Sequence, residues 1–108
     1  MTVKELVERL ELSVLSMPEP EAEVSGAYAG DLLSWVMGRA TEGNAWVTIM
    51  TNVNTVAVAS LTGVALVIIC DSGEIEDEVV KTASQKSVNM ARTSLPMYEM
   101  CVKLSEYV

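Results

Sequence analysis

Residues 44–73, NAWVTIMTNVNTVAVASLTGVALVIICDSG, decide the fold, because residues 44–70 among them form a long uncharged stretch in an acidic chain. No Asp, Glu, Lys or Arg lies between Gly43 and Cys70, although 20% of the 108 residues are charged. Charged residues dominate the surfaces of small proteins, so a stretch without them is expected to be covered by the rest of the molecule. Residues 44–73 are therefore the predicted core.

The pattern within this core predicts a strand, a helix and a second strand. Residues 45–51 form an apolar run rich in β-branched side chains, and two asparagines in residues 52–54 indicate a turn and a helix start. Residues 56–61 are a short apolar helix that Gly63 ends, and residues 64–70 are apolar without alternation. Strands that are apolar on both faces and joined through a helix are typical of a parallel sheet covered on both sides.

The flanking patterns extend this core into one predicted α/β domain, residues 1–108. Helices are expected at 3–10, 32–40, 74–87 and 97–107, with Thr2 and Asp31 as the N-caps of the first two. Strands are expected at 12–16, 24–30 and 88–93, and the Pro- and Glu-rich residues 17–23 are expected to form an exposed loop. The predicted fold is a single small domain with a mostly parallel sheet and helices on both faces.

Charge and composition exclude several partners and locations. A net charge of −8, with seven Lys and Arg, argues against binding to nucleic acid or to an anionic membrane surface. Residues 53–70 are uncharged, but Asn54, Ser60 and Gly63 within them argue against a membrane span. The charged N-terminus lacks a secretory signal, and Cys70 and Cys101 fit neither a zinc site nor a disulfide framework. A reducing cytoplasm is the expected location.

Catalytic and cofactor motifs are absent from the sequence. Without a histidine no acyl-transfer triad can form, and neither glycine-rich phosphate loop is present. Cys70 precedes Asp71, whose charge disfavours a thiolate, so an inert thiol is expected. The acidic residues at 74–78 are expected to stabilise a helix start rather than to hold a metal. We therefore predict no catalytic residue, metal or cofactor, with Asp31 or Asp71 acting as a base in an enzyme as a minor alternative.

Polar residues at the ends of the predicted strands form a candidate ligand site. Ligands of open parallel sheets bind at the carboxyl ends of the strands, where helix N-termini attract anions. The candidate ligand-binding residues are Gly30, Asp31, Thr51, Asn52, Asn54, Asp71, Ser72 and Gly73. Thr51, Asn52 and Asn54 are also explained as caps of the following helix. Both interpretations stay open at this point.

Candidate interface residues lie on two predicted helices. Trp35 lies off the centre of the apolar face of helix 32–40, so it is either covered by a loop or an anchor for a partner. Seven methionines and no phenylalanine suggest adaptable packing or a contact surface. An apolar stripe on the last helix is explained by core packing or by a partner. The candidate interface residues are Trp35, Met37, Met97 and Met100.

Two long stretches, YAGDLLSWVMG at 28–38 and residues 46–99, resemble the DRTGG domain family. The likeness is one of order and spacing: Gly-Asp opens a helix, a strand ends in a polar turn, Thr-Gly precedes an apolar strand, and a proline leads the final helix. The family's fold is related to the N-terminal domain of HPr kinase. Thr51-Asn52 stands where the family has Asp-Arg, and asparagine has neither the charge nor the fork of donors of arginine.

The resemblance implies a homodimeric regulatory module without catalytic residues of its own. Free-standing members are found beside hydrogenase and signalling proteins of anaerobic bacteria, so such a system is the expected partner. Two hypotheses follow. The first is a regulatory or protein-interaction module, and the second is a sensor of a small nucleotide or phosphate-type ligand at the strand ends.

Overall fold

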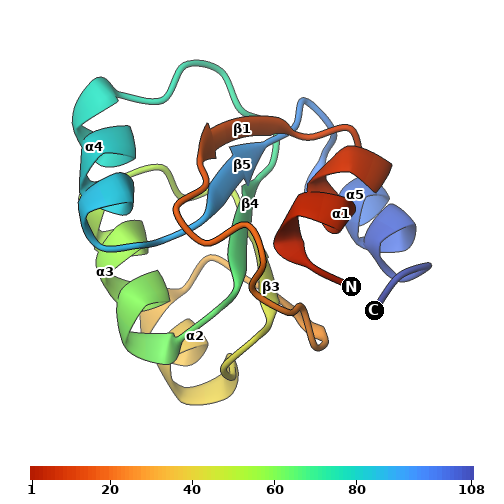
Figure 1. Cartoon of the computed structure of the whole chain (residues 1–108). Coiled ribbons are helices and arrows are strands. Elements are labelled where there is room, and N and C mark those ends of the chain that lie inside the picture. The colour runs from red at the N-terminus through yellow and green to blue at the C-terminus, as the bar shows by residue number, and fades with distance from the viewer.

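A five-stranded sheet forms the centre of the computed structural model, which describes residues 1–108 (Figure 1). Its strands lie in the order β1-β5-β4-β3-β2, and β2 through β5 run parallel while β1 pairs antiparallel with β5. The strands are β1 (Ser13–Ser16), β2 (Ala27–Ala29), β3 (Ala45–Thr48), β4 (Leu66–Ile69) and β5 (Met90–Arg92). The mostly parallel α/β sheet predicted from the sequence is confirmed.

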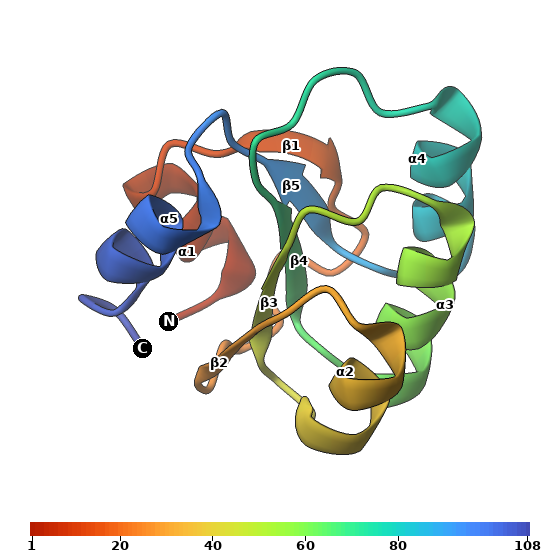
Figure 2. The same ribbon diagram turned by 180° about the vertical axis from the view of Figure 1, so that it is seen from behind.

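Helices cover both faces of the sheet, as Figures 1 and 2 show. One face carries α1 (Val3–Arg9) and α5 (Met97–Leu104), which lie side by side in both views. The other face carries α2 (Leu33–Arg39), α3 (Val53–Thr62) and α4 (Asp77–Gln85). None of these helices is long and apolar enough to cross a bilayer.

The segment at 44–73, uncharged as far as Cys70, contains the buried parallel crossover that the sequence predicts. β3 and β4 pair in parallel register from Ala45↔Leu66 to Thr48↔Ile69, and every residue of both strands is buried. Leu66 and Ile68 pack in the core cluster under α1 and α5, whereas Val67 and Ile69 pack in the cluster under the other three helices. Alternate residues of β4 therefore supply two cores, which explains why the strand shows no polar alternation.

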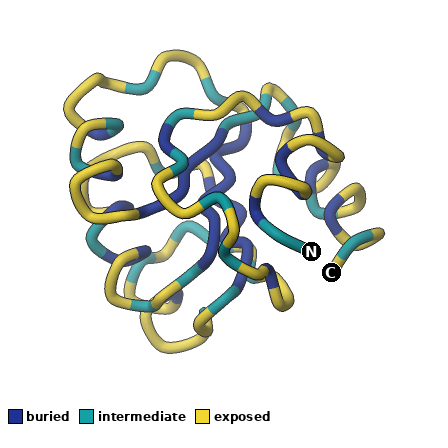
Figure 3. Tube along the Cα trace, viewed as in Figure 1, coloured by how far each residue is buried: buried dark blue, intermediate teal, exposed yellow.

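The burial of the chain follows this layered arrangement, with buried strands at the centre and exposed positions on the outer sides of the helices (Figure 3). The side chain of Asn52 caps the start of α3, and Gly63 is the C-cap at its end. Gly63 has a φ of 74°, a left-handed conformation that glycine adopts without a steric penalty. Both ends of the central helix thus lie where the sequence predicts.

Asp31 does not cap α2, contrary to the prediction. The N-cap position belongs to Leu32, which makes no side-chain cap bond. The carboxylate of Asp31 instead accepts hydrogen bonds from the end of β3, at Thr48 Oγ1 (2.7 Å) and at the Ile49 amide (2.9 Å). A contact with a neighbouring strand has therefore displaced the local cap. Helix α4 is also shorter than expected, since it begins at Asp77 rather than Glu74.

Residues 17–23 are tied to the sheet by their backbone although most of them are exposed. The Glu19 amide donates to Asn89 Oδ1 (2.9 Å), and Asn89 Nδ2 donates to the Glu19 carbonyl (2.7 Å).

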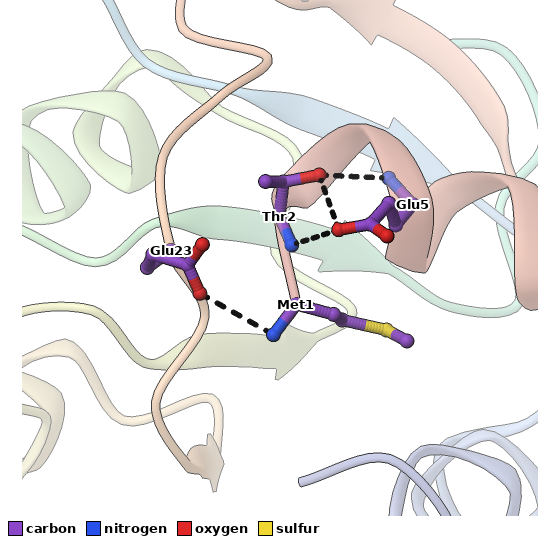
Figure 4. A network of polar contacts seen from close by, with 4 residues as sticks. All are labelled: Met1, Thr2, Glu5 and Glu23. Carbon is purple, nitrogen blue, oxygen red and sulfur yellow. Dashed lines mark hydrogen bonds and ion pairs between the residues drawn. The ribbon is translucent and has the colours of Figure 1, made fainter.

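At the start of the chain, Thr2 and Glu5 form the predicted capping box, and the Met1 amino group lies 3.3 Å from Glu23 (Figure 4). The bond from the Thr2 amide lowers the pKa of the Glu5 carboxyl.

Candidate functional site

The strand-end residues predicted to bind a ligand do not form a single pocket. Gly30 and Asp31 follow β2, residues 51–54 follow β3, and residues 71–73 follow β4. Each of these three groups has its own hydrogen bonds and its own surroundings.

Gly30 and Asp31 hold the end of β2 against β3. The indole N–H of the buried Trp46 donates to the Gly30 carbonyl (2.9 Å), which satisfies the polar group of a side chain with no exposed surface. One Asp31 oxygen accepts both bonds from Thr48 and Ile49 described above. These groups are thus occupied within the fold.

Residues 51–54 chiefly serve the start of α3. Asn52 Oδ1 accepts from the amides of Asn54 (2.9 Å) and Thr55 (3.3 Å), which is the geometry of an N-cap. Thr51 and Asn52 line a cavity of about 200 Å³ together with Glu76 and Glu78. Ligand pockets usually hold at least about 300 Å³. The capping interpretation therefore has direct geometric support, and ligand contact here stays a prediction.

Residues 72 and 73 belong to a larger cleft between the ends of β4 and β5, called here the Arg92 cleft. Its volume is about 410 Å³ and no apolar residue lines it. Its lining residues are Ser13, Ser72, Gly73, Glu74, Arg92, Thr93 and Ser94. Asp71 does not line it. Arg92 Nη1 donates to the Gly73 carbonyl (2.7 Å), and Ser72 Oγ donates to the Thr93 carbonyl (3.2 Å).

The sequence interpretation missed Arg92 and Ser13 as site residues. Arg92 ends a strand that was recognised by its apolar residues, and it stands directly before the polar pair Thr93-Ser94. Ser13 reaches the cleft only because β1 pairs with β5 in the register Ser13↔Arg92. The position of Arg92 was a usable signal, since a lone cation preceded a predicted polar strand end. No local pattern marks Ser13.

The candidate interface residues divide into exposed and buried ones. Trp35 and Met37 on α2 are 53% and 44% exposed, and the Arg39 guanidinium stacks 4.2 Å from the centroid of the Trp35 ring. Met97 is half-buried and packs against the core under α5. Met100 is completely buried in that core, so its prediction as an interface residue was wrong. The apolar stripe of the last helix is explained by core packing at this position.

The outer edge of β2 is a surface that was not singled out from the sequence. β2 pairs with β3 alone, through bonds that include Ala45 N to Gly26 O and Gly30 N to Val47 O, both 3.0 Å. Because ladder bonds alternate along a parallel strand, the N–H and C=O groups of Ala27 and Ala29 point away from the sheet. Both alanines are exposed.

An uncharged groove runs beside this edge, between β2 and the end of α5, and is called here the β2 groove. Its volume is about 360 Å³. Its lining residues are Gly26, Ala27, Tyr28, Ala29, Val47, Cys101, Leu104, Ser105 and Val108. Each of the four other cavities is lined by at least one charged side chain. The β2 groove is therefore unlike the rest of this acidic surface.

Thiol and metal chemistry find no support in the geometry. Cys70 is 1% exposed, and burial, together with Cys101 and the carboxylates of Asp71 and Asp31, raises the pKa of its thiol to about 12. Such a thiol is protonated at neutral pH and is a poor nucleophile, as the sequence predicts.

The largest cavity, about 480 Å³ beside Glu19, Glu23 and Glu42, contains no metal-ligand set, since no three carboxylates or thiols are suitably grouped.

Comparisons with known proteins identify the fold and not the family. No protein-family model and no curated protein matches the sequence. A similar solved structure is that of the CBS and DRTGG domains in the regulatory region of a Clostridium perfringens pyrophosphatase, in complex with the activator diadenosine tetraphosphate. The TM-score is 0.71 at 11% identity, and the alignment covers 95% of this chain and 45% of the other.

This likeness shows a fold shared with part of a regulatory region. The chain spans less than half the length of that region, so the ligand and the assembly of the pyrophosphatase are not transferred with the fold. The resemblance to the DRTGG family is consistent with this neighbour. Membership of the family stays a prediction.

Proposed function

We propose that this protein is a non-catalytic regulatory module that acts as a homodimer through the β2 edge. The observation that carries the proposal is an unpaired and uncharged strand edge in a protein of net charge −8. A regulatory role is also supported by the fold neighbour, which is a regulatory region rather than a catalytic domain. The expected link to a signalling or hydrogenase-related system stays a prediction.

The backbone of the β2 edge suits a second copy of the same chain. Unpaired N–H and C=O groups at a sheet edge are a template for another strand. A two-fold axis beside β2 would place the strand antiparallel to its copy, so that each edge supplies both the donors and the acceptors that the other needs. Natural edges are often blocked by lysine, proline or an inward charge, and residues 24–30 contain none of these.

Charge also favours this edge over the charged surfaces of the molecule. Two copies with a net charge of −8 each repel one another, so a stable contact is best formed where neither copy presents charge. The β2 groove contains no charged side chain and adds apolar area from Leu104 and Val108. The exposed Trp35 and Met37 are the alternative contact, but the Trp35 ring is already stacked with Arg39.

Sedimentation equilibrium tests the homodimer. We expect the wild-type chain to sediment at twice its 11.7 kDa mass at tens of micromolar. Ala29→Glu places a carboxylate on the edge of each copy, and it should shift the protein to a monomer with unchanged circular dichroism. The matched control is Leu61→Glu, which adds the same charge at an exposed position on α3.

Two results would remove the proposal. One is a wild-type protein that stays monomeric over this concentration range. The other is a dimer that Ala29→Glu leaves intact, and if Trp35→Ala then dissociates it, the contact belongs to α2 instead. Recovery of a partner protein by the Leu61→Glu control but not by Ala29→Glu would additionally connect the dimer with regulation.

A further inference from the structure

We propose that the Arg92 cleft binds a phosphate-type anion. This site goes beyond the homodimer proposed above and does not depend on it, because the two features lie at different parts of the sheet. β2 is one edge strand, whereas the cleft lies at the ends of β4 and β5, beside the other edge strand β1.

The charge of Arg92 is free to meet a ligand. The only ion pair of the molecule joins the Met1 amino group and Glu23, so no carboxylate lies within 4.0 Å of the Arg92 guanidinium. One of its five N–H donors is bonded, to the Gly73 carbonyl at 2.7 Å. That bond and the half-buried position of the side chain hold the guanidinium in the cleft while the other donors remain available. Fixed, unpaired guanidinium groups are well suited to phosphate oxygens.

Hydroxyl groups supply the remaining donors. Ser13 and Ser94 make no hydrogen bond within the protein through their side chains, and both residues line the cleft. Thr93 Oγ1 accepts from the Leu95 amide at 3.2 Å, which leaves its O–H as a further donor. A guanidinium flanked by two free hydroxyls matches an anion with several acceptor oxygens, and such a ligand would connect β5 with β1 and with the segment after β4.

The lining of the cleft narrows the class of anion. No apolar or aromatic side chain lines it, so a nucleoside base would find no surface on which to stack. The site therefore fits a compact anion such as phosphate or pyrophosphate, or the terminal phosphate of a nucleotide whose base stays in solvent. Glu74, an exposed carboxylate at the same cleft, opposes the binding of any anion. Its removal should therefore strengthen the interaction.

Isothermal titration calorimetry with inorganic phosphate, pyrophosphate and adenosine diphosphate tests the site. We expect one site per chain for phosphate and pyrophosphate. Arg92→Gln should weaken binding by at least about tenfold, the effect of losing a charge-assisted hydrogen bond. Glu74→Gln should tighten it severalfold. Arg39→Gln removes the same charge from α2, away from the cleft, and should leave the affinity unchanged.

A second variant protects the test against misfolding of Arg92→Gln. Ser94 is exposed, so Ser94→Asp should fold normally and abolish binding by placing a carboxylate among the donors. Adenosine diphosphate should bind no more tightly than pyrophosphate, because its base finds no surface in the cleft, and a much tighter nucleotide would contradict recognition of the phosphate group alone. The proposal is overturned if no anion binds at millimolar concentration, or if binding survives both Arg92→Gln and Ser94→Asp. Sedimentation of these variants should match wild type, which separates this outcome from failure of the dimer.

Discussion

The thiol of Cys70 is enclosed at the end of β4 and holds its proton more tightly in the folded chain than in the unfolded one. Burial raises its pKa to about 12, whereas an unfolded cysteine titrates near about 8.5. Between these two values the unfolded chain loses the proton and the folded chain keeps it. The free energy of unfolding therefore falls as the pH rises through this window, and below it the thiol contributes no pH dependence.

Replacing Cys70 with alanine should remove this part of the alkaline destabilisation. Urea unfolding of wild type and Cys70→Ala at pH 7.5 and pH 10 measures it. We expect the wild type to lose more stability than the variant between the two values, because every other titrating group is common to both proteins. Equal losses in the two proteins would contradict a raised pKa at Cys70.

At the scale of elements, Asn89 joins the loop at 17–23 to the beginning of β5. Its side chain makes three bonds, accepting from the Glu19 amide and donating to the carbonyls of Glu19 and Ala65. The residue is 2% exposed. An apolar side chain of similar size would leave the Glu19 amide and the Ala65 carbonyl without partners, which is costly for each group. The Glu19 carbonyl would keep its bond from the Ala22 amide (3.2 Å).

Asn89→Leu should therefore lower the free energy of unfolding by about 3 kcal/mol, the combined penalty of unpaired backbone groups. Urea unfolding measures the loss, and hydrogen exchange should show reduced protection of the Glu19 amide. The control is Glu19→Ala, since the side chain of Glu19 forms none of these bonds. A loss no greater than that of the control would show that the loop is held by other contacts.

Helices and strands were predicted correctly where the residues that define them lie close together in the sequence. The β3-α3-β4 crossover was predictable because it carries no charge, has an asparagine cap and ends in a glycine, all within one stretch. The prediction that Asp31 caps α2 was wrong because a Gly-Asp pair before a helix has the pattern of a cap. Its actual partners, Thr48 and Ile49, lie at the end of another strand. The prediction that Met100 lies in an interface was wrong because an apolar stripe on a helix has the same sequence pattern whether it packs against a sheet or against a partner.

The candidate site was less predictable than the fold for the same reason. Ser72 and Gly73 were found from the end of a buried strand. Ser13 and Arg92 meet only through the antiparallel pairing of β1 with β5, which no local pattern near either residue indicates. The β2 edge was hidden because exposure of backbone groups depends on which strand lies outermost, and strand order is a property of the whole sheet.

For the whole molecule, net charge and the uncharged groove together set the salt dependence of association. Two copies with a net charge of −8 repel at long range, and the β2 groove contains no charged side chains whose attraction salt would weaken. Screening reduces repulsion beyond about 10 Å at 0.1 M salt. The proposed homodimer should therefore become tighter with added salt.

Sedimentation equilibrium at about 20 mM and about 300 mM sodium chloride tests this dependence, since the Debye length falls several-fold between them. We expect the dissociation constant of the dimer to decrease at the higher concentration. An interface built from ion pairs would give the opposite trend, and that result would direct attention to charged surfaces instead of β2.

The antiparallel pairing of β1 with β5 also constrains how the chain folds during synthesis. Ser13 is synthesised long before Arg92, the residue with which it pairs. In the same way, α1 is synthesised long before α5, which covers the same face of the sheet. β2, β3 and β4 can assemble while these first residues lack their partners, because their connections are local. A nascent chain arrested before residue 90 lacks β5 and α5 and should thus leave part of the apolar side of α1 uncovered, so chaperones would be expected to bind there until residues 90–104 have been made.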